Sequence, residues 1–159
     1  GASGAAAALP PLPAGAMAFE LVQARGLDLG SLSPVSRRFL LNGDGASGAQ
    51  DRRAGAVLVG RQHQWELFNA WIPDEAMRTC ISRTAFEVSW GANLSNPQLL
   101  AKGANPVAVN GRIASREVPV PLLAGARVAF VYSTTGDSIF LELRFAVAPA
   151  AAAPAPGAQ

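Results

Sequence analysis

The hydrophobic residues of this chain occur in short runs, and this feature constrains the fold most. The runs are four to seven residues long, are rich in β-branched and aromatic residues, and are separated by turn signals such as Asn110-Gly111. No segment keeps the helical spacing of apolar residues over three turns. We therefore expect an all-β chain without helices, a β-sandwich of about ten to eleven short strands.

The expected strands follow the apolar runs. They span residues 19–23, 38–41, 56–59, 65–68, 86–90, 98–101, 106–109, 117–120, 127–132 and 139–145, and a further strand is expected to begin near Ile81. In the last run, strict alternation puts Phe140 on one face with Glu142 and Arg144. The opposite face then holds Ile139, Leu141, Leu143 and Phe145.

A length of 159 residues leaves room for one domain, which we expect over residues 17–147. Residues 1–16 and 148–159 consist mainly of Ala, Gly and Pro, and we expect both to be flexible tails. The run Pro10-Pro11-Leu12-Pro13 could alternatively be a polyproline ligand. Residues 43–55, with their glycines and small polar side chains, are predicted to be a long loop.

Composition excludes several classes of protein. Thirteen basic residues face eleven acidic ones, a net charge of +2, so bulk charge does not predict nucleic-acid binding. The sequence has no uninterrupted apolar run of about eighteen residues, so we expect no membrane-spanning helix. The one cysteine allows no internal disulfide and suits an intracellular location, nuclear or cytoplasmic. Because the chain begins at Gly1, we expect that it is a fragment of a longer protein.

The residues give little support for catalysis, so we expect no enzyme, no metal and no cofactor. A serine or cysteine nucleophile usually needs a base, and the one imidazole, His63, has no acidic residue at a suitable spacing. Cys80 suits a small buried side chain, and Asp74-Glu75 suits a solvated turn. Trp65, Trp71 and Trp90 suit packing, although Trp71 is in a predicted loop that could dock a partner.

A different set of residues occurs at the predicted strand ends. Gly60-Arg61 ends one run, Ser82-Arg83 precedes the next, and Asn105 and Asn110-Gly111 flank a third. A Pro-Leu-x-x-Gly stretch follows at residues 121–125. In order and spacing, these pieces resemble the forkhead-associated (FHA) domain family over about residues 56–146. The resemblance implies an FHA-like β-sandwich that binds phosphothreonine peptides of a partner protein.

The resemblance also implies a role for each matching residue. Arg61 falls on the arginine that meets the phosphate, and Ser82 on the serine whose hydroxyl donates to a phosphate oxygen. Arg83 falls on a position that touches the phosphate or the peptide backbone, and Asn105 on the asparagine that holds the peptide main chain. The loop-shaping positions are Gly60, Asn110 and Gly111. Arginine forks and hydroxyl donors also suit phosphate on chemical grounds alone.

The chain departs from the family pattern at several positions. Ala85 replaces a histidine that ties loops together, Ala104 replaces a hydroxyl residue beside the phosphate, and Pro106-Val107 replaces a Gly-Thr pair. These departures leave an alternative open, in which a degenerate phosphate site serves phosphate-independent protein assembly. Arg61 alone could also be an ordinary strand-end arginine in an ion pair with Glu87 or Asp74.

Overall fold

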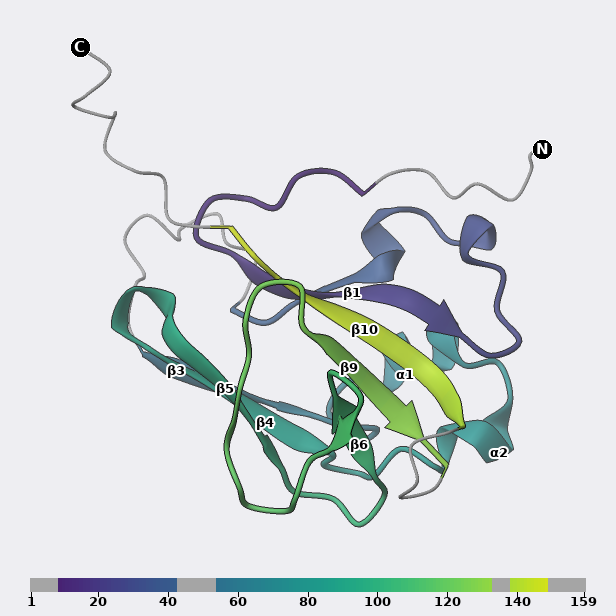
Figure 1. Ribbon diagram of the computed structural model, residues 1–159. Helices are drawn as coiled ribbons and strands as arrows, with labels where there is room; N and C mark the ends of the chain where they lie inside the picture. The colour runs from purple at the N-terminus through teal and green to yellow at the C-terminus, as the bar shows by residue number, and fades with distance from the viewer. Residues whose placement is uncertain (1–8, 43–53, 133–137, 149–159) are drawn as a thin grey trace.

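The computed structural model describes residues 9–42, 54–132 and 138–148, and these form two facing antiparallel β-sheets (Figure 1). One sheet has the order β2-β1-β10-β9-β6-β7, and the other has the order β3-β4-β5-β8. The predicted β-sandwich is therefore confirmed. Most of the predicted 43–55 loop, and the outer parts of both predicted tails, lie outside the described residues.

The strands coincide with most of the predicted runs. They are β1 (Met17–Ala24), β2 (Arg38–Leu40), β3 (Gly55–Val59), β4 (Phe86–Gly91), β5 (Ser95–Ala101), β6 (Val107–Val109), β7 (Arg112–Ile113), β8 (Val120–Pro121), β9 (Arg127–Val131) and β10 (Ile139–Val147). The helical elements are η2 (Leu29–Ser31), η3 (Val35–Arg37), α1 (Trp65–Trp71), α2 (Glu75–Arg78) and η4 (Ala92–Leu94).

Aromatic rings fill the space between the two sheets. Phe19 of β1 meets Phe86 of β4 edge to face, with ring centroids 5.8 Å apart, and Phe86 meets Phe130 of β9 at 6.0 Å. All three side chains are buried. Edge-to-face and tilted ring pairs are favourable geometries, each contributing about 0.5–1.5 kcal/mol beyond buried area. These contacts fix how the two sheets face each other.

The predicted faces of β10 are wrong at its first two residues. Ile139 pairs with Val131 and Leu141 pairs with Phe130, so Phe140 is an extra residue in a β-bulge. The bulge turns Phe140 into the core, while Ile139 packs on the outer face of the sheet against Val131. Strict alternation holds only after the bulge.

The expectation of no helices is also wrong. The apolar run at residues 65–68 begins α1, not a strand, and the stretch at Ile81 lies in an irregular segment. Phe68 and Trp71 are buried, with ring centroids 6.0 Å apart, so α1 is held by packing against the core. A helix of two turns is marginal on its own, and tertiary packing decides its formation.

The first and last described segments lie side by side. The Gly15 N–H donates to the Ala148 carbonyl at 2.9 Å, and the Ala148 N–H donates to the Ala16 carbonyl at 2.9 Å. Ala16 is fully buried, so these pairings extend beyond the predicted 17–147 boundary. No helix within the described ranges is long and apolar enough to cross a bilayer.

Candidate functional site

Three loops meet at one end of the sandwich. The last pair of the β3–β4 ladder is Val59 with Phe86, and Phe86 also pairs with Ala101 at the end of β5. The segments that follow β3, precede β4 and follow β5 therefore leave the sheet together. They carry Arg61, Ser82 and Asn105, respectively, so the three predicted residues are brought to one place.

Ser82 lies at the centre of this end. The Arg61 N–H donates to the Ser82 carbonyl at 3.0 Å, and the Asn105 N–H donates to Ser82 Oγ at 3.0 Å. A hydroxyl has one hydrogen to donate and two lone pairs. Accepting the Asn105 N–H therefore leaves the Ser82 O–H able to donate to a ligand.

The Arg61 side chain is anchored by a neutral acceptor. Its Nε donates to the Ile81 carbonyl at 3.1 Å, and the residue is half-buried. The terminal nitrogens of the guanidinium fork carry further donors. The ion pairs described for the structure include none between Arg61 and Glu87 or Asp74 within the described ranges. Asp74 instead caps α2 by accepting the Ala76 N–H at 2.9 Å.

Arg83 is placed beside this cluster with its side chain exposed. Its carbonyl accepts the N–H of Gln62 at 3.1 Å, so the backbone of the serine loop follows that of the arginine loop for two residues. The cluster thus holds two arginines, one anchored and one exposed to solvent.

Two glycines permit the close approach of the loops. A Cβ built on Gly60 would lie 2.2 Å from the Arg83 carbonyl oxygen, which is backbone and has little freedom to shift. A Cβ built on Gly103 would lie 2.3 Å from Ser82 Oγ and 2.9 Å from the Thr84 carbonyl oxygen. The sequence analysis identified Gly60 as loop-shaping but missed Gly103. The Lys102-Gly103 turn signal was present, but nothing in the sequence showed that the turn packs on Ser82.

A side-chain hydrogen bond, which the sequence analysis also missed, links two of the loops. His63 Nε2 and Thr84 Oγ1 are 2.7 Å apart, and both residues are half-buried. Next to His63, Gln64 accepts the Gly60 N–H at 2.9 Å and donates to the Leu58 carbonyl at 2.8 Å. His63 is therefore part of the loop framework and has a threonine, not an acid, as its partner.

Asn110 and Gly111 form a tight turn at the other end of β6 from Asn105. Both have positive φ angles, of 51° and 85°, and they connect β6 to β7. Asn110 Oδ1 accepts the Arg127 N–H at 2.9 Å. Asn105 precedes β6 and Asn110 follows it, so the strand separates the turn from the loop cluster.

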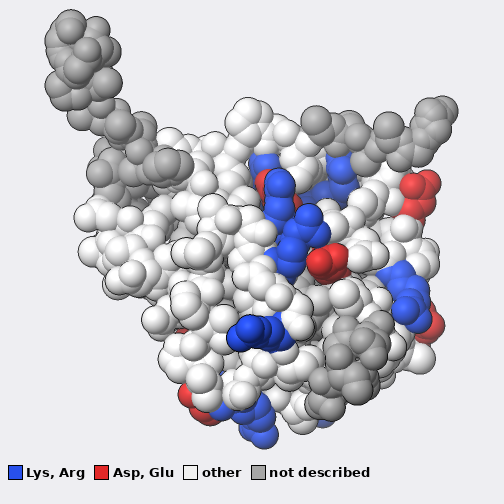
Figure 2. All heavy atoms as spheres, in the orientation of Figure 1, with Lys and Arg blue, Asp and Glu red and all other residues white. Residues whose placement is uncertain are grey.

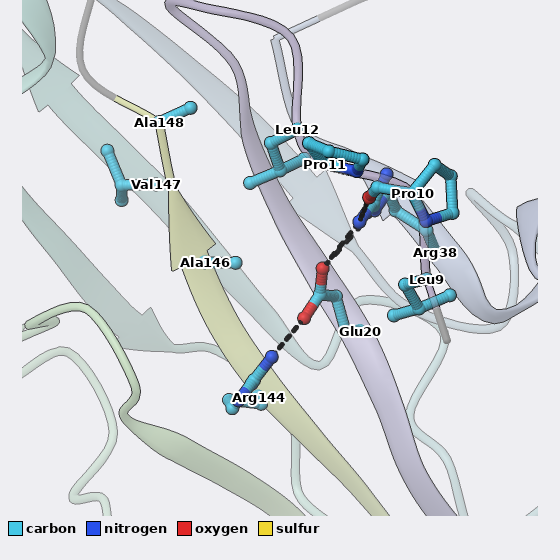
Figure 3. Close-up of a pocket in the computed structure, with 10 residues that line it drawn as sticks. All are labelled: Leu9, Pro10, Pro11, Leu12, Glu20, Arg38, Arg144, Ala146, Val147 and Ala148. Atoms are coloured by element: carbon cyan, nitrogen blue, oxygen red, sulfur yellow. Dashed lines mark hydrogen bonds and ion pairs between the residues drawn. The ribbon is translucent and has the colours of Figure 1, made fainter. Parts of the chain in front are cut away.

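A second cluster of charges lies on the outer face of the six-stranded sheet, where basic and acidic side chains gather (Figure 2). Glu20 of β1 bonds Arg144 of β10 at 2.6 Å and Arg38 of β2 at 2.8 Å (Figure 3). Burial raises the pKa of Glu20, but the hydrogen bonds and charges of the two arginines outweigh it and hold the pKa below its usual value. Only 5% of Glu20 is exposed.

The described part of the predicted N-terminal tail covers this cluster. Arg38 also donates to the Pro10 carbonyl, and residues 9–12 line a pocket of about 470 Å³ together with Glu20 and Arg144 (Figure 3). The polyproline run thus lies against its own domain. The carboxylate in this pocket is already shared by two arginines, so the pocket is not the site that the sequence predicts.

The tryptophans divide between core and surface. Trp71 is fully buried and its Nε1 donates to the Ser36 carbonyl at 2.8 Å, so it is not available to dock a partner as the alternative suggested. Trp65, at the start of α1, is 59% exposed. Trp90 is half-buried against Gly55. Cys80, expected to be buried, is half-buried in the turn after α2.

The comparisons with known proteins identify the fold. No family model matches the chain, and no curated protein matches it. Among solved structures, an engineered FHA domain with a Myc-pTBD peptide matches at a TM-score of 0.52 and 14% identity, covering 83% of this chain and 91% of that one. The N-terminal FHA domain of Rad53p from S. cerevisiae, in complex with a phosphothreonine peptide, matches at 0.51 and 15%, covering 83% and 93%.

A third solved structure, the FHA domain of a hypothetical protein from Arabidopsis thaliana, matches at a TM-score of 0.52 and 9% identity. This match covers 94% of the present chain and 99% of that one. The three matches agree with the two-sheet fold and with the family that the sequence resembles. The chain therefore has the fold of the forkhead-associated domains.

Proposed function

We propose that this protein is an interaction module that binds phosphothreonine peptides through the loops at one end of its sandwich. The observation that carries the proposal is the convergence of Arg61 and Asn105 on Ser82, through hydrogen bonds of 3.0 Å each. The three residues come from loops far apart in the sequence. A phosphate at this point would meet donors from more than one loop at once.

The chemistry of the cluster fits a phosphorylated threonine. Such a residue carries a charge of about −1.5 to −2 and three acceptor oxygens. The fork of Arg61 supplies charge-assisted donors, and its Nε bond to the Ile81 carbonyl holds the fork in place. The hydroxyl of Ser82 donates one short bond, and the exposed Arg83 adds positive charge beside it.

Asn105 supplies the contact to the peptide main chain in this proposal. Its backbone N–H is occupied by Ser82 Oγ, which leaves the side-chain amide to bond an extended peptide. Charge-assisted bonds contribute about 1.5–3 kcal/mol each. Two or three of them, with further side-chain contacts, reach the roughly 8 kcal/mol of micromolar binding.

Two further observations support a binding module over an enzyme. The fold neighbours include structures whose descriptions name a phosphothreonine peptide and a Myc-pTBD peptide as their ligands. The single histidine, His63, bonds Thr84 through its Nε2, and within the described ranges no ion pair joins it to an acidic residue as in a catalytic base.

The test is titration of the protein with a degenerate phosphothreonine peptide library and with the same library unphosphorylated. We expect selective binding of the phosphorylated peptides by the wild-type protein and no measurable binding by Arg61→Ala. Arg112→Ala is the matched control, because Arg112 is exposed and lies beside the Asn110-Gly111 turn, which β6 separates from the loop cluster. It should bind as the wild-type protein does.

Two results would contradict the proposal. If Arg61→Ala binds as well as the wild-type protein, the assigned site is wrong. If a folded wild-type protein binds both libraries equally, the domain serves phosphate-independent assembly, and Ala85, Ala104 and Pro106 would account for the loss of phosphate binding.

A further inference from the structure

The arginine-bearing turn and the serine-bearing loop are joined by three successive contacts. The first two are between backbone atoms, from the Arg61 N–H to the Ser82 carbonyl at 3.0 Å and from the Gln62 N–H to the Arg83 carbonyl at 3.1 Å. The third is between side chains, His63 Nε2 and Thr84 Oγ1, at 2.7 Å. The side-chain contact thus continues the backbone pairing by one step.

The next residue, Ala85, has no polar side chain with which to link the loops. It is buried, and its backbone groups are occupied in the sheet, where its N–H donates to Val59 and its carbonyl accepts from Lys102 and Gly103. The His63–Thr84 bond thus links the two loops at one end of their pairing, and the Arg61 Nε bond to the Ile81 carbonyl links them at the other.

We infer that His63 and Thr84 are positioning residues whose hydrogen bond sets the spacing between the Arg61 fork and the Ser82 hydroxyl. This inference rests on the proposed function, because the spacing matters only if one ligand bridges both groups. Neither side chain need touch the phosphate. Their role is to keep the two loops from separating in the free protein, so that binding does not have to order them.

The surroundings of His63 explain why one hydrogen bond can have this effect. Gln64 bonds both Gly60 and Leu58, so the turn is rigid on the β3 side. On another side, His63 lines a pocket of about 230 Å³ together with Trp65 and Phe39. The Thr84 hydroxyl is the side-chain group that bonds the His63 ring.

The test removes the hydrogen bond from each side. Thr84→Val keeps the shape of the side chain and removes its hydroxyl, His63→Ala removes the ring, and Thr84→Ser keeps the hydroxyl. Thr79→Val is the matched control, because the Thr79 hydroxyl bonds the Ala76 carbonyl at 2.6 Å within α2 and its turn and joins no loops. Each variant is titrated with the best-binding phosphothreonine peptide from the library and with its unphosphorylated twin.

We expect His63→Ala and Thr84→Val each to weaken phosphopeptide binding about fivefold, the loss for one neutral hydrogen bond. The double variant should be no weaker than either single variant, because both remove the same contact. Thr84→Ser and Thr79→Val should bind within twofold of the wild-type protein. In the free protein, amide hydrogen exchange at Arg61 and Gln62 should become faster in Thr84→Val but stay unchanged in Thr79→Val.

The outcomes separate this inference from the proposed function. If the wild-type protein binds selectively but Thr84→Val and His63→Ala bind as it does, the positioning role is wrong and the proposed function stands. A second result would also contradict the inference. If Thr84→Val and His63→Ala lose as much stability as Thr79→Val and bind the phosphopeptide as tightly as Thr79→Val does, the bond has only a structural role. If the wild-type protein shows no selectivity for phosphorylated peptides, both fall together.

Discussion

The two arginine clusters of this protein use the same side chain for opposite purposes. On the outer face of the sheet, Arg38 and Arg144 share the buried carboxylate of Glu20, so one of their two positive charges is balanced within the fold. At the loop end, the Nε of Arg61 bonds a neutral carbonyl, that of Ile81. An arginine anchored by a carbonyl keeps its charge for a ligand, whereas one anchored by a carboxylate stabilises the fold.

Burial and charge alone do not separate the proposed binding site from the Glu20 ion-pair cluster. The pocket beside Glu20 has a volume of about 470 Å³ and three charged side chains, whereas Arg61, Ser82 and Asn105 of the loop cluster are half-buried. What distinguishes the proposed binding site from the Glu20 cluster is the partner of each arginine. The variants below separate the two clusters by asking whether stability or binding is lost.

The largest expected effect is on stability, from Glu20→Ala. Removal of the carboxylate leaves Arg38, whose side chain is only 11% exposed, without its negatively charged partner, and we expect the free energy of unfolding to fall by about 3 kcal/mol. Urea denaturation measures this loss, and the affinity for a phosphothreonine peptide should stay within twofold of wild type.

Glu142→Ala is the control for that variant. Glu142 pairs with the half-exposed Arg127 at 3.4 Å, and such pairs contribute about 1 kcal/mol or less. Equal losses in the two variants, or a loss of peptide affinity in Glu20→Ala, would contradict the division between the clusters.

A pair of glycine variants compares the loop cluster with the Asn110-Gly111 turn. In Gly103→Ala, the new Cβ would lie 2.3 Å from Ser82 Oγ, so Ser82 must move, and we expect peptide binding to weaken about tenfold, or about 1.4 kcal/mol. In Gly111→Ala, the Cβ meets no atom within 4 Å, but φ is +85°. That variant should lose about 1 kcal/mol of stability and no affinity.

Calorimetric titration and urea denaturation of both variants provide the measurements. Gly103→Ala binding as tightly as the wild-type protein would show that the position of Ser82 is unimportant. An effect of Gly111→Ala on affinity would show instead that the Asn110-Gly111 turn is coupled to the loop cluster.

The smallest expected effect is on the pH dependence of stability. The pKa of Glu20 is lowered in the folded protein from its ordinary value of 4.5, so the unfolded state binds the proton first. The stability that Glu20 contributes is therefore fully present at neutral pH. It is lost as the pH falls below about 4.5 and through the lower pKa of the folded state.

The measurement is the difference in unfolding free energy between the wild-type protein and Glu20→Gln at pH 7 and at pH 3. The difference should narrow at pH 3. A constant difference would mean that the charge of Glu20 contributes nothing to the fold.

Much of the architecture could be predicted from the sequence, because strand periodicity is a local signal. The run at residues 86–90 became β4, with Phe86 and Val88 buried, and Gly60-Arg61 and Ser82-Arg83 were assigned to the ends of apolar runs that lie together in space. Order along the chain was sufficient here, because antiparallel neighbours bring their connecting loops to the same edge.

The remaining features depend on contacts between distant segments. The helix α1 forms because Phe68 and Trp71 pack into the core. Its two turns are too short to give a periodic signal in the sequence. Only the fold brings His63 next to Thr84, and Gly103 next to Ser82, because about twenty residues separate each pair and no local sequence pattern spans that distance. The misplaced Phe140 has a similar cause, because a bulge is set by the partner strand.

The pairing of Gly15 and Ala16 with Ala148 has a mechanical consequence. β1 and β10 are antiparallel neighbours, and Met17 pairs with Val147 beside these contacts, so β1 begins and β10 ends side by side. Tension applied through the flanking segments would peel β1 from β10 one hydrogen bond at a time, and would not shear the whole ladder at once. The loop cluster lies at the far end of β10, so the first bonds to open under load are those most distant from Arg61 and Ser82.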